Sequence, residues 1–293
     1  MPSDATRTSG SLRRKPLHEE LDVYGLTHTG LVRDTNQDHF LVGSLRKHME
    51  VEYTSLPKPE QLPLAGERLA YLAMVADGVG SGEGGEEASR VTIEVASQYV
   101  SSGMSCYYTA DSHDETAFFD AMQQAAITCH TSVVERAESD AERRGMATTL
   151  TLWIGVWPWS YLLQVGDSRC YVFRRGRLTQ ISRDQTMAQE LVDQGVLERS
   201  DLENSRWANV LSSAIGGQQT APVVTRIRQL WGSVGLLCSD GLTKHVPDER
   251  IAERLGSMTS AKQVCEALLQ DALDAGGSDN ITIIVGRALQ KDR

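Results

Sequence analysis

The stretch Leu69-Ala70-Tyr71-Leu72-Ala73-Met74-Val75-Ala76-Asp77-Gly78 tells more about the fold than any other part of the chain. Its first eight residues form a continuous apolar run, which ends abruptly at an aspartate followed by a glycine. A short apolar run bounded by a turn signal is typical of a buried strand. We therefore predict a strand that ends at Ala76 and holds Asp77 at its mouth.

Outward from this run, the pattern predicts clustered strands and paired helices. Strands are expected at 22–27, 39–42, 149–156, 161–165, 170–173, 178–181, 223–230, 234–238 and 281–285, and helices at 86–100, 116–137 and 261–273, with a polar helix-like segment at 186–205. The elements lack the regular alternation of a doubly wound sheet. The fold class is therefore α+β, built on mostly antiparallel sheet.

Domain boundaries follow from composition. Residues 1–20 are rich in Ser, Thr and Arg without periodicity, which predicts a flexible tail. Residues 44–66 combine prolines with mixed charges and are expected to form a loop insertion. We expect 21–293 to be one catalytic domain.

Charge and cysteine content narrow the class of protein. The 293 residues carry 29 Lys and Arg against 39 Asp and Glu, a net charge of −10, which argues against nucleic acid as a partner. The five cysteines are widely spaced and include no C-x-x-C pair, as expected for free thiols in a reducing compartment. The N-terminus lacks the apolar segment of a secretory signal. We expect a monomeric, cytoplasmic protein.

One uncharged stretch, 145–166, is long enough to cross a bilayer. Pro158 in its middle and the alternation of Leu150, Leu152 and Ile154 argue instead for a buried hairpin that turns near Trp157. We therefore expect no membrane span.

Several apolar strands end in an aspartate beside a small residue. The candidates are Asp77, Asp167 and Asp240, which follow such runs, and Asp38 and Asp279, which precede strands. Any one of them could simply mark a turn. Together they suggest a site for a hard divalent cation, because carboxylate, carbonyl and water oxygens suit Mg²⁺ or Mn²⁺.

A motif that suggests a different function follows the apolar run at 69–76. Gly80-Ser81-Gly82-Glu83-Gly84-Gly85 satisfies G-x-G-x-x-G between a strand and a helix, as a dinucleotide-binding turn would. Its neighbouring acids would face a pyrophosphate with like charge, and two helices follow before any strand. We therefore favour the cation site.

The order of these motifs resembles the metal-dependent Ser/Thr protein phosphatases of the PPM family, also called type 2C, and in compactness their bacterial branch. The resemblance runs from about residue 23 to 287. It rests on Gly30-Leu31-Val32-Arg33-Asp34-Thr35-Asn36-Gln37-Asp38, Asp77-Gly78-Val79-Gly80, Gly145-Met146-Ala147-Thr148-Thr149, Gly166-Asp167-Ser168-Arg169, Ser239-Asp240-Gly241-Leu242 and Gly277-Ser278-Asp279-Asn280-Ile281-Thr282.

The resemblance implies two antiparallel sheets packed as a central sandwich and flanked by pairs of antiparallel helices. It implies two Mg²⁺ or Mn²⁺ ions and hydrolysis of phosphoserine or phosphothreonine by a hydroxide that bridges them. By position, Asp77 would bridge both metals, Gly78 would offer its carbonyl, Asp240 and Asp279 would complete one metal's shell, and Asp38 would lie by the other. The substrates would be phosphoproteins, the targets of a cognate Ser/Thr kinase.

Further roles are implied for Arg33, which would grip the substrate phosphate, for Asp167, which would serve a weaker third metal, and for 183–216, which would form a flap. The chain departs from the family pattern at Gln37, at Lys244, where an acid of the third site is usual, and at Gln185. We hypothesise a two-metal centre whose third site is poor, because an ammonium opposes a cation.

Two alternatives stay open on the sequence alone. One is a catalytically weak relative that binds phosphoproteins as a scaffold, which Gln37 and Lys244 suggest. The other, more remote, is a metal-binding protein without enzymatic activity.

Overall fold

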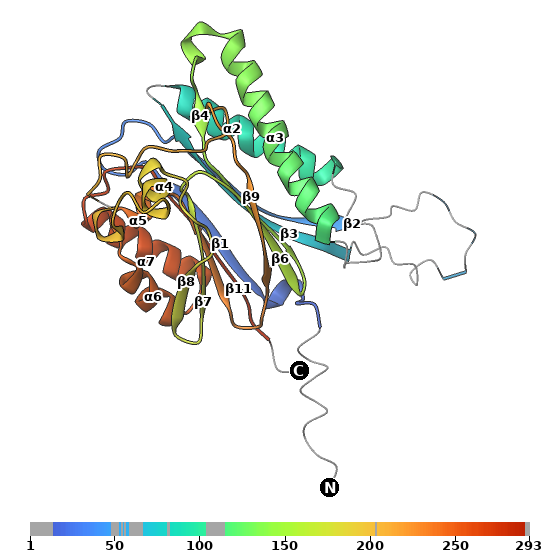
Figure 1. Cartoon of the computed structure of the whole chain (residues 1–293). Coiled ribbons are helices and arrows are strands. Elements are labelled where there is room, and N and C mark those ends of the chain that lie inside the picture. The colour runs from blue at the N-terminus through green and yellow to red at the C-terminus, as the bar shows by residue number, and fades with distance from the viewer. Residues whose placement is uncertain are drawn as a thin grey trace.

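The chain folds into two packed antiparallel sheets with helices on both outer faces, as a computed structural model shows (Figure 1). The structure describes residues 14–47, 53, 55, 57, 58, 67–80, 83–103, 115–202 and 204–290.

Each sheet brings together strands from distant parts of the chain. The first has the order β1 (Leu21–His28), β11 (Ile281–Ala288), β10 (Val234–Cys238), β7 (Arg169–Arg174) and β8 (Arg177–Gln180). The second has the order β2 (Asp38–Lys47), β3 (Glu67–Val79), β5 (Leu150–Val156), β6 (Trp159–Val165) and β9 (Val223–Arg228), with the short β4 (Ala147–Thr148) paired to β3. Every strand pair among the described residues is antiparallel. The predicted α+β class is confirmed, and the dinucleotide-binding alternative, which needs parallel strands, is wrong.

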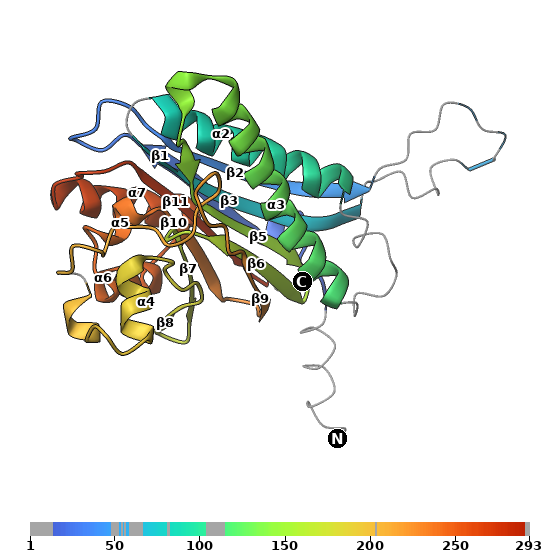
Figure 2. The same cartoon turned by 45° about the horizontal axis from the view of Figure 1, so that its top comes forward.

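Helices cover the two outer faces of the sandwich (Figure 2). The second sheet is covered by α2 (Glu83–Gln98) and α3 (Glu115–Ser139), and the first by α5 (Asp240–Thr243), α6 (Asp248–Gly256) and α7 (Ala261–Asp274), while α4 (Met187–Asp193) lies in the 183–216 segment. Short helical turns lie at His18–Glu20, Tyr99–Gly103, Ala141–Arg143 and Arg199–Asp201.

The opening apolar run explains how the layers are joined. Successive side chains of a strand point to opposite faces, so β3 supplies two cores at once. Leu72 and Met74 pack in the core under α2 and α3, whereas Ala73 and Val75 pack in the core between the sheets. A third core lies between the first sheet and α7. The run is continuous because both faces of β3 are buried.

Two segments differ from the expectation at their edges. Part of the predicted flexible tail is anchored to the domain: Glu20 is only 3% exposed, and Arg14 pairs with it at 2.5 Å. Residues 17–19 are exposed. Residues 44–47, assigned to the insertion, continue β2. The rest of the predicted tail, 1–13, and most of 48–66 lie outside the described residues.

The uncharged stretch at 145–166 forms the β5–β6 hairpin, with Trp157 and Pro158 at its turn, as predicted. In the described part of the chain, no helix combines the length and apolar character needed to cross a membrane.

An ion cluster joins α6 to α7. Asp271 accepts hydrogen bonds from Arg254 at 2.7 Å and from Arg250 at 3.0 Å. These hydrogen bonds, opposed by partial burial, hold the pKa of Asp271 well below its ordinary value. A depressed pKa stabilises the fold above the pKa of the unfolded chain, and that contribution disappears as the pH falls toward the folded pKa.

We therefore expect Asp271→Asn to lower the free energy of unfolding by about 1 kcal/mol near pH 7. The difference from wild type should shrink progressively below about pH 4, the ordinary aspartate range. Urea denaturation across this pH range measures it. Asp274→Asn, three residues along on an exposed position, is the matched control. A difference that stayed constant down to pH 2 would contradict the assignment.

Candidate metal centre

One end of the sandwich collects the aspartates from separate elements. Asp38 begins β2 and lies directly opposite Asp77 of β3 in the strand register. Asp240 follows β10 as the first residue of α5, Asp279 lies two residues before β11, and Asp167 follows β6. The structure thus gathers the predicted metal ligands from both sheets at one end of the sandwich.

Asp38 is held by hydroxyl groups on only one of its two oxygens. Its Oδ2 accepts hydrogen bonds from Ser239 and Thr282, each at 2.7 Å. Its Oδ1 is buried, and no described residue hydrogen-bonds to it. Burial, reinforced by the charges of Asp240 and Asp279, raises the pKa of Asp38 to about 6 despite the two hydroxyls. A buried acceptor without a donor is costly, so this oxygen fits a cation ligand.

The backbone of Asp77 is fixed from the neighbouring strands. Its N–H donates to the Thr149 hydroxyl at 3.0 Å, and its carbonyl accepts from Thr149 N at 2.9 Å and from the Thr148 hydroxyl at 2.8 Å. Burial and repulsion from Asp38 and Asp240 raise the pKa of its carboxyl group well above the ordinary value. The carboxyl group therefore extends from a fixed backbone position into a field of like charges.

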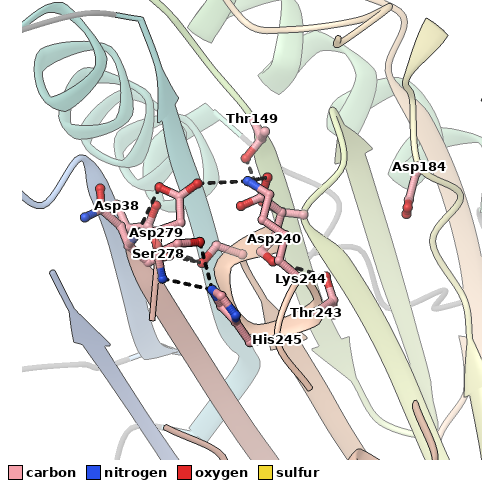
Figure 3. Close-up of polar contacts among 12 residues, drawn as sticks. Asp38, Thr149, Asp184, Asp240, Thr243, Lys244, His245, Ser278 and Asp279 are labelled. Carbon is pink, nitrogen blue, oxygen red and sulfur yellow. Dashed lines mark hydrogen bonds and ion pairs between the residues drawn. The ribbon is translucent and has the colours of Figure 1, made fainter. Parts of the chain in front are cut away.

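Lys244 neutralises the other side of the cluster (Figure 3). Its Nζ lies 2.6 Å from Asp240 and 2.8 Å from Asp279. Burial would lower the pKa of Lys244, but the two carboxylates outweigh it and raise that pKa. The lysine therefore sits as an ammonium ion between two of the predicted metal ligands.

Arg33 pairs with Asp279 through a two-point contact. Its Nε and Nη2 lie 2.8 and 3.1 Å from the two carboxylate oxygens. Burial alone would raise the pKa of Asp279, but the hydrogen bonds from Arg33 and Lys244 lower it. The Arg33 side chain is 53% exposed, so its guanidinium group stands at the open side of the cluster.

Asp167 lies near this cluster but is anchored differently. Burial and repulsion from Asp240 and Asp184 raise the pKa of Asp167 to about 7. The turn that carries it is held by Gln185, whose Oε1 accepts from Gly166 N at 2.7 Å and whose Nε2 donates to Ala221 O at 2.8 Å. The amide at position 185 thus fixes the turn that presents Asp167.

Close backbone contacts explain two of the glycines. A Cβ on Gly241 would lie 1.9 Å from the carbonyl oxygen of Asn280, and one on Gly78 would lie 2.2 Å from that of Gly85. No side chain fits at such distances. Gly241 lets α5 start against the Asn280 backbone, which brings Asp240 beside Asp279.

The sequence did not reveal several residues that organise this end. The side chain of Asn280 holds the loop before β2 through three hydrogen bonds. Its Nδ2 donates to the carbonyls of Thr29 and Thr35, and its Oδ1 accepts from Gln37 N. His245 is partly buried and accepts a hydrogen bond from Ser278 N at 2.9 Å. Both lie in or beside the aspartate motifs, and that proximity was the available signal.

These residues fit divalent cations by their chemistry. Asp38, Asp77, Asp240 and Asp279 supply oxygen donors, one of them an unsatisfied buried oxygen, in a field of like charge that a cation would relieve. In the described ranges, no group of three His, Cys, Asp or Glu side chains forms a ready-made metal site. Lys244 and Arg33 hold two of the carboxylates instead.

The 183–216 segment lies beside this end of the molecule. At its start, Arg183 N donates to the side chain of Gln164 in β6 at 3.0 Å. Thr186 bridges to Leu211 within the segment, and Ile215 bridges to Thr148 next to Asp77. A cleft of about 770 Å³ separates this segment from α5 and the start of α6, with Arg183 and Asp248 among its lining residues.

The fold and site define a protein phosphatase 2C domain. The model of the family described as "Protein phosphatase 2C" matches residues 64–277, and the chain belongs to this family.

Individual relatives are bacterial Ser/Thr phosphatases. The chain is 32% identical over 224 residues to the serine/threonine protein phosphatase PstP of Mycobacterium tuberculosis. The matched region covers 76% of this chain and 41% of PstP. The chain therefore spans less than half the length of that relative. A crystal structure of the M. tuberculosis phosphatase superposes with a TM-score of 0.74 at 27% identity, covering 92% of this chain and 99% of the solved one. A structure of the PstP catalytic domain in complex with two manganese ions gives a TM-score of 0.70 at 29% identity, with the same coverage of both chains.

Proposed function

We propose that this chain is a metal-dependent phosphatase that hydrolyses phosphoserine and phosphothreonine in proteins. The observation that carries the proposal is the cluster of Asp38, Asp77, Asp240 and Asp279 at one end of the sandwich, with an unsatisfied buried oxygen on Asp38. Membership of the phosphatase 2C family and the two manganese ions of the PstP complex support it.

Each residue has a role that follows from its placement. One cation would be held by Asp38 and Asp77. The other would be held by Asp77, Asp240, Asp279 and the carbonyl of Gly78. When bound, such ions lower the pKa of water and stabilise the charge that develops during hydrolysis of a phosphate ester.

Arg33 orients the substrate. Its planar fork already holds a carboxylate at two points, and a phosphate group offers the same two-point geometry. The exposed guanidinium can therefore exchange Asp279 for an incoming phosphate, which aligns phosphorus with the metal centre.

The test is phosphate release from a phosphothreonine peptide by the purified protein, with Mn²⁺ and with a chelator. We expect turnover only with Mn²⁺ or Mg²⁺. Binding of the phosphopeptide without turnover at any metal concentration would reject the enzyme and favour the scaffold alternative.

Substitution of Arg33 should separate binding from chemistry. We expect Arg33→Ala to lower kcat/KM for the phosphopeptide by about 10- to 100-fold, the contribution of a charge-assisted two-point contact. Most of this loss should lie in KM, because the metal ligands remain. Arg33→Lys keeps the charge without the fork and should recover only part of it. If both variants had the same kcat/KM as wild type, Arg33 would have no role in substrate binding.

The wider biological setting is also a proposal. We propose that 21–293 acts as one catalytic domain with 183–216 as its flap, that it is monomeric, and that its substrates are made by a cognate Ser/Thr kinase. A cytoplasmic location is supported by Cys129, Cys170, Cys238 and Cys265, which are buried free thiols. Sedimentation of the purified protein tests the monomer.

A further inference from the structure

A second cavity, of about 130 Å³, opens between the two sheets at the end opposite the aspartates. It is lined by Tyr71 near the start of β3, Gly235 near the start of β10, and Gly286 near the end of β11. The aspartates lie at the other ends of these same three strands. The cavity is therefore separate from the metal centre.

The inner wall of the cavity is apolar and leaves room for a ligand. Val23, Ala73, Leu237 and Ile284 line it and belong to the core between the sheets. A Cβ placed on Gly235 would meet only the carbonyl oxygen of Gly286, at 3.8 Å. A cavity of similar volume lined by apolar side chains is large enough for a single aromatic ring.

The mouth of the cavity is positively charged. Lys15, Arg68, Arg228 and Arg287 are among its lining residues, and no aspartate or glutamate of the described part of the chain lines it. Arg287 is neutralised by Asp22, which lies 3.0 Å away. Lys15 donates a hydrogen bond to the carbonyl of Arg68. The positive charge of Arg68 and Arg228 is therefore the part of this lining that is complementary to an anion.

Arg68 is the cation best placed to meet a ligand. It is half-buried and donates to the carbonyl of Pro16, and no carboxylate among the described side chains pairs with it. Burial and the nearby charge of Arg46 lower the pKa of Arg68. A half-buried guanidinium without a counter-ion is unfavourable, and an anion would relieve it.

Trp157 adds an unused hydrogen-bond donor. It lines the same cavity, and its indole N–H is buried without an acceptor among the described residues. Buried donors are normally paired. Because the Trp157 N–H has no acceptor among the described residues, a ligand oxygen in the cavity would satisfy it.

We propose that this cavity binds a small carboxylate with a short apolar tail, the tail between the sheets and the carboxylate against Arg68. The apolar wall, the uncompensated cation and the unused donor each correspond to one part of such a ligand. The site does not depend on the proposed phosphatase activity.

The test uses hexanoate, with hexanamide as its uncharged counterpart. Binding is followed by calorimetry and by the fluorescence of Trp153 and Trp157, both of which line the cavity. We expect saturable binding of hexanoate with a rise in melting temperature, and at least tenfold weaker binding of hexanamide. No saturable binding of hexanoate would overturn the proposal.

Two variants separate the tail from the carboxylate. Gly235→Val should fill the cavity and weaken the binding of both compounds at least tenfold. Arg68→Met should weaken hexanoate at least tenfold and leave hexanamide unchanged, which abolishes the preference for the charged ligand. Neither residue lies near the aspartates, so metal-dependent phosphatase activity should stay at the wild-type level in both and report correct folding.

If Gly235→Val fails to fold, Gly235→Ala replaces it, because its single methyl group meets nothing closer than 3.8 Å. Hexanoate binding that is unchanged in Arg68→Met and in the glycine variant would place the ligand elsewhere and reject the site.

Discussion

Asp77→Asn should reduce the proposed metal-dependent phosphatase activity by about a thousandfold or more and yet raise the stability of the metal-free protein. The loss follows from the position of Asp77, opposite Asp38 in the strand register and surrounded by the other carboxylates. Asparagine keeps the shape of the side chain and the backbone hydrogen bonds to Thr149. It removes the charge that two cations would share, and losses of this size are typical when a central electrostatic group is removed.

The gain in stability has a different origin. Burial and neighbouring acids raise the pKa of Asp77 well above the ordinary value. A carboxyl group whose pKa is higher in the folded chain than in the unfolded chain destabilises the fold at neutral pH, because its charge is more costly there. A neutral asparagine escapes that cost. We expect the metal-free melting temperature to rise by about 2 °C or more, which corresponds to about 1 kcal/mol.

Two measurements check this prediction together. Thermal melts with and without Mn²⁺ should show metal stabilisation in wild type and little in Asp77→Asn, while the phosphopeptide assay shows the loss of turnover. Asp120→Asn, an exposed acid of α3, should match wild type in both. A variant that keeps its activity, or whose metal-free form melts lower than wild type, would contradict the role of Asp77.

The sequence predicted the layers of this fold because their signals are local. The run 69–76 revealed the doubly buried β3, and alternation revealed the β5–β6 hairpin. Two helices were missed. Helix α5 has only four residues, and α6 is highly charged, with only Ile251 and Leu255 buried, so neither has a long apolar stripe.

For the site, too, local features could be predicted from the sequence and long-range contacts could not. Which aspartates lie at strand ends can be read from the chain, and the structure brings them together. Which partner each carboxylate takes depends on distant segments: Ser239 and Thr282 approach Asp38 across more than 200 residues of sequence. Spacing carries no information on such contacts. The salt bridge from Lys244 to Asp279 depends likewise on how α5 packs against the turn before β11.

Replacing Lys244 by methionine should strengthen metal binding by about tenfold or more. The Lys244 ammonium lies within 2.8 Å of both Asp240 and Asp279, so a divalent cation that uses these carboxylates must compete with it. The interaction of unit charges at about 4 Å is worth about 4 kcal/mol near a protein surface, and a fraction of that suffices for a tenfold change. Methionine keeps an unbranched chain of similar length without the charge.

Calorimetric titration of the metal-free protein with Mn²⁺ measures this competition directly, independently of turnover. Lys262→Met, which removes an exposed lysine paired only loosely with Glu266 at 3.7 Å, is the matched control and should bind Mn²⁺ like wild type. Lys244→Asp should go further, because it adds a carboxylate near Asp167 and should create an additional, weaker Mn²⁺ site. Unchanged Mn²⁺ affinity and stoichiometry in both Lys244 variants would mean that the lysine does not compete with the metals. Tighter binding would identify Lys244 as a tethered cation that sets how much free metal this centre requires.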